Sequence, residues 1–196
     1  MASLPPIVEP PQEDPTKPAP GELEVLRRFV NTHEIDERTD SIATPEALRD
    51  WLAERGLLAR TETLDEDDVR QARSVREAIR SLLLANNGFE LDPRAVETLN
   101  NAARTAEVVV SFGDAGKPQL SPVRPGLQGA LGRLLGVTFR SMADGTWKRL
   151  KACAAHDCEF AFYDASKNHS GTWCDMKTCG NRAKARSYRA RQRPAG

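Results

Sequence analysis

The feature that most constrains the fold is a cluster of cysteines near the C-terminus. The chain has 196 residues and four cysteines, and all four lie between Cys153 and Cys179. They form two pairs, Cys153-x4-Cys158 and Cys174-x4-Cys179, and 15 residues separate the pairs. Each pair can form a tight turn around a tetrahedral ion, and zinc prefers four thiolate ligands in closed structural sites. The spacing therefore predicts one structural zinc ion per chain, bound by all four cysteines.

Other interpretations of the cysteines are weaker. A chain of this length can bury a core without covalent staples, and its N-terminus lacks the pattern of a secretory signal, so two disulfides are disfavoured. A catalytic zinc ion needs an open coordination position, which four thiolates do not leave. His156 and His169 lie in the same region and could replace a cysteine as ligand, but with four cysteines neither is needed.

The residues around the cysteines predict a small module with little core of its own. Residues 159–164 (EFAFYD) alternate as a strand, residues 166–171 (SKNHSG) form a turn, and residues 172–174 (TWC) return as the partner strand. Asp175 can cap a helix whose first turn contains Cys179, and the dipole of that helix would stabilise the thiolate. A zinc hairpin followed by such a helix is a treble-clef-like arrangement.

The segment before this module predicts a mainly helical domain with a small β-hairpin, so the expected fold class is α+β. Residues 1–21 hold seven of the thirteen prolines and are expected to form an arm outside the core. Helices are expected after the caps Thr44, Asp65 and Asp92, and helical spacing also begins at Leu23 and Leu127. EVVVSF and QLSPV predict the two hairpin strands. The helical spacing selects, as core-facing side chains, Leu23, Leu26, Phe29, Val30, Leu48, Trp51, Leu52, Val69, Ala72, Val75, Ile79, Leu82 and Leu83. The spacing of Leu131, Leu134, Leu135 and Phe139 indicates the helix that begins near Leu127.

Charge is divided unequally along the chain. Residues 1–147 hold 24 acidic and 17 basic residues, whereas residues 148–196 hold 4 acidic and 11 basic residues. A basic end of this kind indicates a polyanionic partner. The expected C-terminal helix has two basic faces, which comprise Arg182, Arg186, Arg189 and Arg193 on one side and Lys184, Tyr188 and Arg191 on the other. No acidic residue follows Asp175, so nothing within this helix neutralises it.

Two segments resemble known families. Cys179, Gly180, Asn181 and Arg182 spell the motif CGNR, and residues 149–191 resemble the CGNR zinc finger, including the aromatic residue after the second cysteine. Upstream, FVNT at residues 29–32 and TPEALRDWLAERGLL at residues 44–58 resemble the ABATE domain. That domain accompanies this finger in bacterial proteins regarded as stress-induced transcriptional regulators.

The resemblance implies a DNA-binding transcriptional regulator in three parts. These are a proline-rich arm (1–21), an ABATE-like helical domain (22–147) and a CGNR-type zinc finger with a basic C-terminal helix (148–196). The expected nucleic-acid contacts are Arg186, Arg189, Arg193 and Lys184, and the residues expected to support the zinc site are Asn181 and Arg182. A single helix contacts few base pairs of DNA, so sequence-specific binding is expected to need a homodimer. The helical domain is expected to survive loss of a zinc ligand because it has its own core.

Other functions stay open at this stage. The zinc module could instead bind RNA or an acidic protein surface. Asn31, Thr32 and His33 could line a pocket for a small-molecule effector, which would make the protein a one-component sensor, although such residues are more often caps or satisfied core polar groups.

The motifs that the sequence lacks narrow the range of expected functions. The sequence has no glycine-rich phosphate loop, no GxSxG and no HExxH, so an enzyme is not expected. It has no run of 18 apolar residues and no secretory signal, so a cytoplasmic protein without a membrane partner is expected.

Overall fold

The computed structural model describes residues 6–8, 18–112, 116 and 118–192. Most of the expected proline-rich arm and residue Arg193 lie outside these ranges. The described helices are α1 (Leu23–Val30), α2 (Pro45–Glu54), α3 (Glu66–Asn86), α4 (Pro93–Thr105), α5 (Gly126–Ala143), the 3-10 turn Trp147–Arg149, the π-helical turn Met176–Gly180 and α6 (Asn181–Gln192). The described strands are β1 (His33–Glu34), β2 (Thr39–Asp40), β3 (Val108–Phe112), β4 (Pro118–Pro122), β5 (Leu150–Ala152) and β6 (Ala161–Tyr163).

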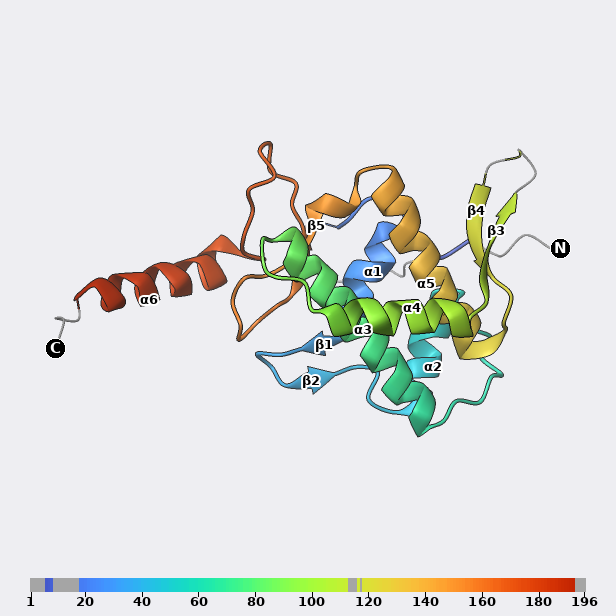
Figure 1. The fold of residues 1–196 in the computed structure, drawn as a ribbon. Coiled ribbons are helices and arrows are strands. Elements are labelled where there is room, and N and C mark those ends of the chain that lie inside the picture. The colour runs from blue at the N-terminus through green and yellow to red at the C-terminus, as the bar shows by residue number, and fades with distance from the viewer. Residues whose placement is uncertain (1–5, 9–17, 113–115, 117, 193–196) are drawn as a thin grey trace.

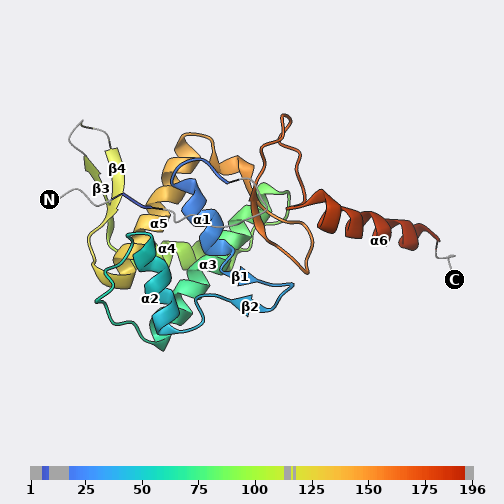
Figure 2. The same cartoon turned by 180° about the vertical axis from the view of Figure 1, so that it is seen from behind.

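Helices dominate this architecture, and the strands form three separate antiparallel pairs, β1-β2, β3-β4 and β5-β6. Figures 1 and 2 show α1 to α5 gathered into one body, with the β3-β4 hairpin at one end and α6 extending from the other. This arrangement confirms the predicted mainly helical α+β class.

Local capping explains where the main helices begin. The hydroxyl of Thr44 accepts a hydrogen bond from the Ala47 amide, and Pro45 occupies the first position of α2. Asp65 and Asp68 form a reciprocal capping box at the start of α3. These interactions satisfy amide groups that have no partner within the helix. The predicted start of α3 directly after Asp65 is therefore confirmed.

The core lies between α1, α2, α3 and α5. Phe29 and Trp51 meet in it with their ring centroids 5.4 Å apart, and the Arg55 guanidinium carbon lies 3.9 Å from the Trp51 ring centroid. Most of the predicted core residues are buried, and Leu82 is half-buried. On α5 the buried stripe runs through Leu134, Val137 and Ser141. Phe139 lies off this stripe and is 52% exposed.

Glycines on α5 allow the helix to approach the β3-β4 hairpin closely. A Cβ atom on Gly132 would lie 2.7 Å from the Pro122 Cβ and 2.9 Å from the Ala106 Cβ. These distances are shorter than carbon atoms tolerate, so a larger residue here would force the hairpin away.

Within the described part of the chain, none of the helices combines the length and apolar character needed to span a membrane.

The predicted hairpin of the cysteine module was partly wrong. Residues 161–163 do form a strand, β6, but its partner is β5, which precedes the first cysteine, and not residues 172–174. Leu150, Ala152 and Ala161 from this pair belong to the main hydrophobic core and contribute to the same cluster as Phe29 and Ile79. The module is therefore attached to the helical body through a shared core.

Candidate metal centre and basic helix

The four cysteine sulfurs converge on one point. Their Sγ atoms all lie within 4.8 Å of one another. Cys158 and Cys174 are 3.7 Å apart, and Cys174 and Cys179 are 3.8 Å apart. A zinc ion with Zn–S bonds of about 2.3 Å requires sulfur separations of about 3.8 Å at the edges of its tetrahedron. The cluster therefore has the dimensions of a four-cysteine zinc site, with the ligands that the spacing predicted.

Electrostatics also favour a cation at this point. Hydrogen bonds from the thiols of Cys158 and Cys174 lower the pKa of Cys153 to about 2. Donation to Cys153 raises the pKa of Cys158 to about 12, and the pKa of Cys174 is raised further by its bonds to both other sulfurs. The sulfurs are too close to ionise together unless a positive ion offsets their charge. A bound zinc ion supplies that charge and a closed structural cross-link.

Backbone hydrogen bonds hold the first cysteine pair and the segment before the second pair. The Cys153 amide donates to the Phe160 carbonyl at 3.0 Å, and the next amide, that of Ala154, donates to Thr172 at 3.1 Å. Cys158 closes its turn by donating to Ala155 at 2.9 Å. These hydrogen bonds hold the backbone at Cys153 and Cys158 in place without the help of a metal ion.

The second cysteine pair opens the C-terminal helix. The Asp175 carboxylate accepts a hydrogen bond from the Lys177 amide at 2.8 Å and so caps the π-helical turn. Cys179 lies in this turn, which runs directly into α6. The last sulfur is therefore at a helix N-terminus, as the sequence suggested, although this first turn is π-helical.

Arg182 and Asn181 lie beside the cluster in different ways. The Arg182 guanidinium donates to the Cys179 sulfur at 3.1 Å, and this interaction raises the pKa of Arg182. Asn181 donates to the Lys177 carbonyl at 3.1 Å, which lies in the turn before α6. Arg182 therefore touches a metal ligand directly, whereas Asn181 stabilises the backbone that carries it.

Helix α6 projects from the body. Both views show it extending away from α1 to α5 (Figures 1 and 2), and its strongest packing is with the turn that precedes it. Lys184, Arg186 and Arg189 are exposed, while Arg193 lies outside the described residues. An acidic residue from outside the helix lies near the base of this face. Asp157 lies 3.6 Å from Arg182 and 3.9 Å from Arg186, because the first cysteine loop folds back beside α6.

The residues proposed as an effector pocket make contacts within the protein. The Asn31 amide group donates to the Ala161 carbonyl at 2.9 Å and accepts from the Ala161 amide at 2.7 Å. The Thr32 hydroxyl donates to the Phe29 carbonyl, and the His33 ring lies 3.2 Å from the Glu77 carboxylate. The contacts of Asn31 and Thr32 account for their polar groups without a bound molecule, and effector binding stays a prediction.

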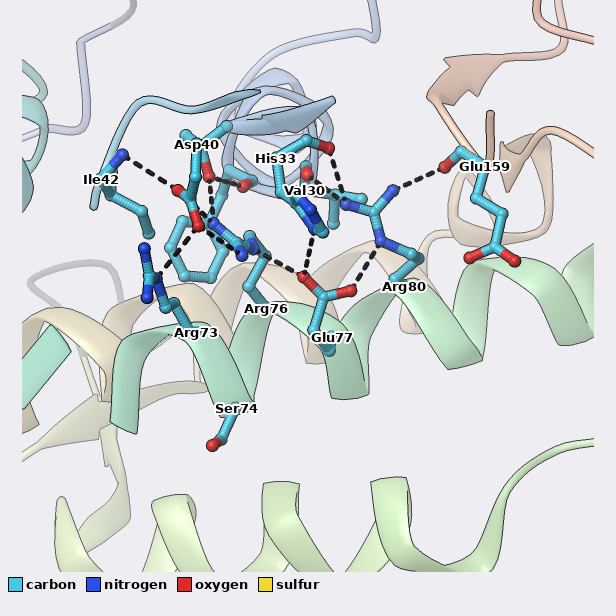
Figure 3. Close-up of polar contacts among 12 residues, drawn as sticks. Val30, His33, Asp40, Ile42, Arg73, Ser74, Arg76, Glu77, Arg80 and Glu159 are labelled. Atoms are coloured by element: carbon cyan, nitrogen blue, oxygen red, sulfur yellow. Dashed lines mark hydrogen bonds and ion pairs between the residues drawn. The ribbon is translucent and has the colours of Figure 1, made fainter. Parts of the chain in front are cut away.

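A charged network on α3 was missed by the sequence analysis (Figure 3). Arg76 forms two hydrogen bonds with the Asp40 carboxylate, at 2.9 and 3.0 Å. Glu77 lies between Arg76 and Arg80 and contacts both at 2.8 Å. Burial alone would raise the pKa of Asp40, but its bonds to Arg76 hold it below the usual range. The signal in the sequence was a set of charges on the otherwise apolar stripe of α3.

Arg80 connects three parts of the protein through backbone carbonyl groups. Its guanidinium donates to Val30 at the end of α1, to His33 in β1 and to Glu159 in the cysteine module, at 2.8, 3.0 and 2.7 Å (Figure 3). The side chain is almost fully buried. The helical body therefore positions the chain directly after Cys158.

Comparisons with protein families match two overlapping parts of the chain. A model described as "CGNR zinc finger" matches residues 149–192. A second model, ABATE, described as "Putative stress-induced transcription regulator", matches residues 24–153, which is more than half of the chain. No curated protein matches the sequence.

Proposed function

The chain belongs to the ABATE family and carries a CGNR zinc finger, and we propose that it is a transcriptional regulator that binds duplex DNA through α6. The observation that carries this proposal is the position of α6. Its described side chains are almost all exposed, and the helix leaves the body at the turn that carries Cys179. An isolated helix of 12 residues is only marginally stable in water, so packing or a ligand is needed to hold it.

The charge of α6 indicates the class of partner. The described helix contains arginines and a lysine but no acidic residue. Guanidinium groups donate paired hydrogen bonds to phosphate oxygens and to guanine edges, and a helix of this width fits the major groove. We assign Arg186 and Arg189, together with Arg193, to the DNA contacts, with Lys184 on the adjacent face. Arg182 is engaged with Cys179 and supports the root of the helix.

The zinc site sets the direction of α6 in this proposal. Cys153 and Cys158 are tied to the body through β5, β6 and Arg80, and Cys179 lies in the turn before α6. A metal held by all four sulfurs joins the rigid body to the root of the helix. Four thiolates leave no open coordination position, so the proposed role of the metal is structural and the protein is proposed not to be an enzyme.

The test is the salt dependence of DNA affinity. Fluorescence anisotropy with a labelled duplex should show a steep loss of affinity with salt for the natural protein. Changing Arg186, Arg189 and Arg193 to alanine should flatten the slope of log K against log salt by roughly 2 to 3, because each lost phosphate contact removes about one released counterion. Changing the exposed Arg60, Arg94 and Arg104 to alanine is the matched control, since it removes the same charge from the body. A triple α6 variant that keeps both its zinc and its slope would contradict the proposal.

Sequence preference needs a second experiment. Selection of bound fragments from genomic DNA at about 150 mM salt should enrich a common site if the protein recognises an operator. Because one helix covers few base pairs, we expect two copies of the chain on such a site. Equal binding to all fragments would show that the helix binds polyanions without recognising an operator. Tighter binding to RNA or to an acidic protein than to DNA would favour those partners instead.

A further inference from the structure

One of the four cysteine sulfurs is more accessible than the others. Cys153, Cys158 and Cys179 are buried, whereas Cys174 is half-buried. Cys174 lies on the wall of a cleft of about 650 Å³ between the β1-β2 loop and the zinc module. The cleft is also lined by Cys158 and Cys179. A small molecule in this cleft would therefore meet the sulfur of Cys174 first.

The sulfurs also differ in their hydrogen-bond donors. Amide groups of Ala155 and Cys174 donate to the Cys153 sulfur, and the Phe160 amide donates to Cys158. The Arg182 guanidinium donates to Cys179 at 3.1 Å. Hydrogen bonding to a thiolate stabilises its charge and lowers its nucleophilicity, so these donors reduce the reactivity of Cys153, Cys158 and Cys179. The choice of Cys174 rests on its greater exposure to the cleft.

We propose that Cys174 is an oxidation site at which a small uncharged peroxide reacts with the zinc-binding cluster, and that Cys158 is its disulfide partner. The sulfurs of these two residues are 3.7 Å apart. Cys179 is almost equally close to Cys174, at 3.8 Å, but the charged hydrogen bond from Arg182 makes its thiolate the weaker nucleophile.

The reaction proceeds in two steps. The Cys174 thiolate attacks one oxygen of hydrogen peroxide, the O–O bond breaks, hydroxide leaves, and a sulfenic acid forms. The Cys158 thiolate then attacks the Cys174 sulfur, so that an S–S bond forms, the S–O bond breaks and a second hydroxide leaves. The two thiolates lose two electrons to the peroxide, and two protons from solvent convert the hydroxides into water. Loss of two of four ligands releases the zinc ion.

The charges of the cleft select the class of oxidant. Glu34, Asp36 and Glu37 face the zinc module across the cleft, and Lys177 and Arg182 are the basic residues in its lining. Asp175 adds a further carboxylate, so acidic groups exceed basic ones, and the thiolate cluster adds negative charge. An anionic reagent is therefore repelled, whereas hydrogen peroxide carries no charge and enters freely.

Oxidation would act on the root of α6. Zinc release would free Cys179 and the turn Met176–Gly180 from the metal, and so remove the cross-link between this turn and the body. The consequence for DNA affinity rests on the proposed function, whereas the oxidation itself does not.

The experiment uses the full zinc-loaded chain and hydrogen peroxide. Zinc release is followed with a chromogenic chelator, and the disulfides are mapped by mass spectrometry in samples quenched early with an alkylating reagent. We expect zinc to leave as a Cys158–Cys174 disulfide accumulates. Cys174→His keeps a four-ligand site of the Cys3His type while it removes the reactive sulfur. We expect zinc release to slow about tenfold or more in this variant, and Cys179→His, the matched control, to stay within about twofold of the natural protein.

Several results would overturn the proposal. A first oxidation product without Cys174, or a disulfide that forms without zinc release, contradicts it, and a Cys174–Cys179 disulfide contradicts the assigned partner. If the histidine variants do not bind zinc, limited alkylation of the natural protein with iodoacetamide tests the proposal instead. The proposal requires that Cys174 is modified before the other three cysteines. None of these readouts involves DNA, so an oxidation site without DNA binding, or DNA binding without an oxidation site, would be recognised.

Discussion

The two ends of the zinc module differ in what surrounds them. The β5-β6 pair is inserted into the helical body, where Leu150, Ala152 and Ala161 share the core. Helix α6, only a few residues beyond the last ligand, is exposed along almost all of its described length. The same four cysteines join these two environments. The difference indicates that the metal centre belongs structurally to the body, and that its outer end presents a charged helix to a partner.

Metal removal is the strongest test of this comparison, and we expect the largest effect from it. Zinc binding in small modules is worth about 10 to 16 kcal/mol of apparent free energy. Because β5 and β6 share the core of the helices, Cys153→Ser or a chelator should lower the unfolding temperature of the whole chain. Circular dichroism at the helical band measures this. An unchanged midpoint would show that the helical domain is independent, as the sequence alone suggested.

Trp51 provides a reference for how far a substitution in the core of the helical body lowers the free energy of unfolding. The side chain is 9% exposed and contacts Phe29 and Arg55. Trp51→Ala should therefore destabilise the protein by roughly 3 to 5 kcal/mol. Urea denaturation followed by circular dichroism measures the change. The control is Val110→Ala, since Val110 is 62% exposed, and a loss below about 1 kcal/mol for Trp51→Ala would contradict the assignment.

Asp40 tests the charged network on the body side. Asp40→Asn weakens the pair with buried Arg76 and should cost roughly 2 to 3 kcal/mol at neutral pH. The pKa of Asp40 is lower in the folded protein than in the unfolded chain. The stability from this pair is therefore present above about pH 4 and is lost as the pH falls towards the folded pKa.

The pH dependence is measured as a difference between the natural protein and Asp40→Asn. Zinc release in acid affects both proteins and cancels in this comparison. The difference in unfolding free energy should be largest near pH 7 and should shrink below about pH 4. A difference that stays constant through this range would contradict the ion pair.

Asn31 joins α1 to the zinc module. Asn31→Ala removes both hydrogen bonds to the Ala161 backbone and should cost about 2 kcal/mol. Asn31→Asp is the matched variant, because it keeps an acceptor for the amide but places an oxygen against the Ala161 carbonyl. Chemical denaturation and competition with a zinc chelator should both show weakening. If neither variant changes zinc retention, the body and the metal centre are less coupled than their contacts indicate.

The smallest effect on stability is expected in α6. Lys184 and Arg189 are exposed and make no described ion pair, so changing both to alanine should alter the unfolding free energy by no more than about 0.5 kcal/mol. The same variant should bind duplex DNA more weakly under the proposed function. A large loss of stability would show that α6 packs against the body in solution.

Local features account for the success of the sequence analysis. The caps Thr44, Asp65 and Asp92 mark helix starts because their side chains bond amides only two or three residues away. The β3-β4 hairpin is also local, since its two strands lie close together in the sequence. The errors involve longer distances. Residues 172–174 looked like a strand, but the partner of β6 precedes the first cysteine, and the contact of Asp157 with Arg186 spans a folded loop.

The sequence by itself determined where the capped helices begin, the cysteine ligands and the basic character of the C-terminus, because each depends on residue type and short spacing. Only the tertiary structure decided that β5 and β6 enter the helical core, that Arg80 reaches the cysteine loop and that Cys174 faces a cleft. These features depend on which distant segments bury one another, and burial is a property of the packed chain as a whole. The local sequence of a cysteine pair does not contain that information.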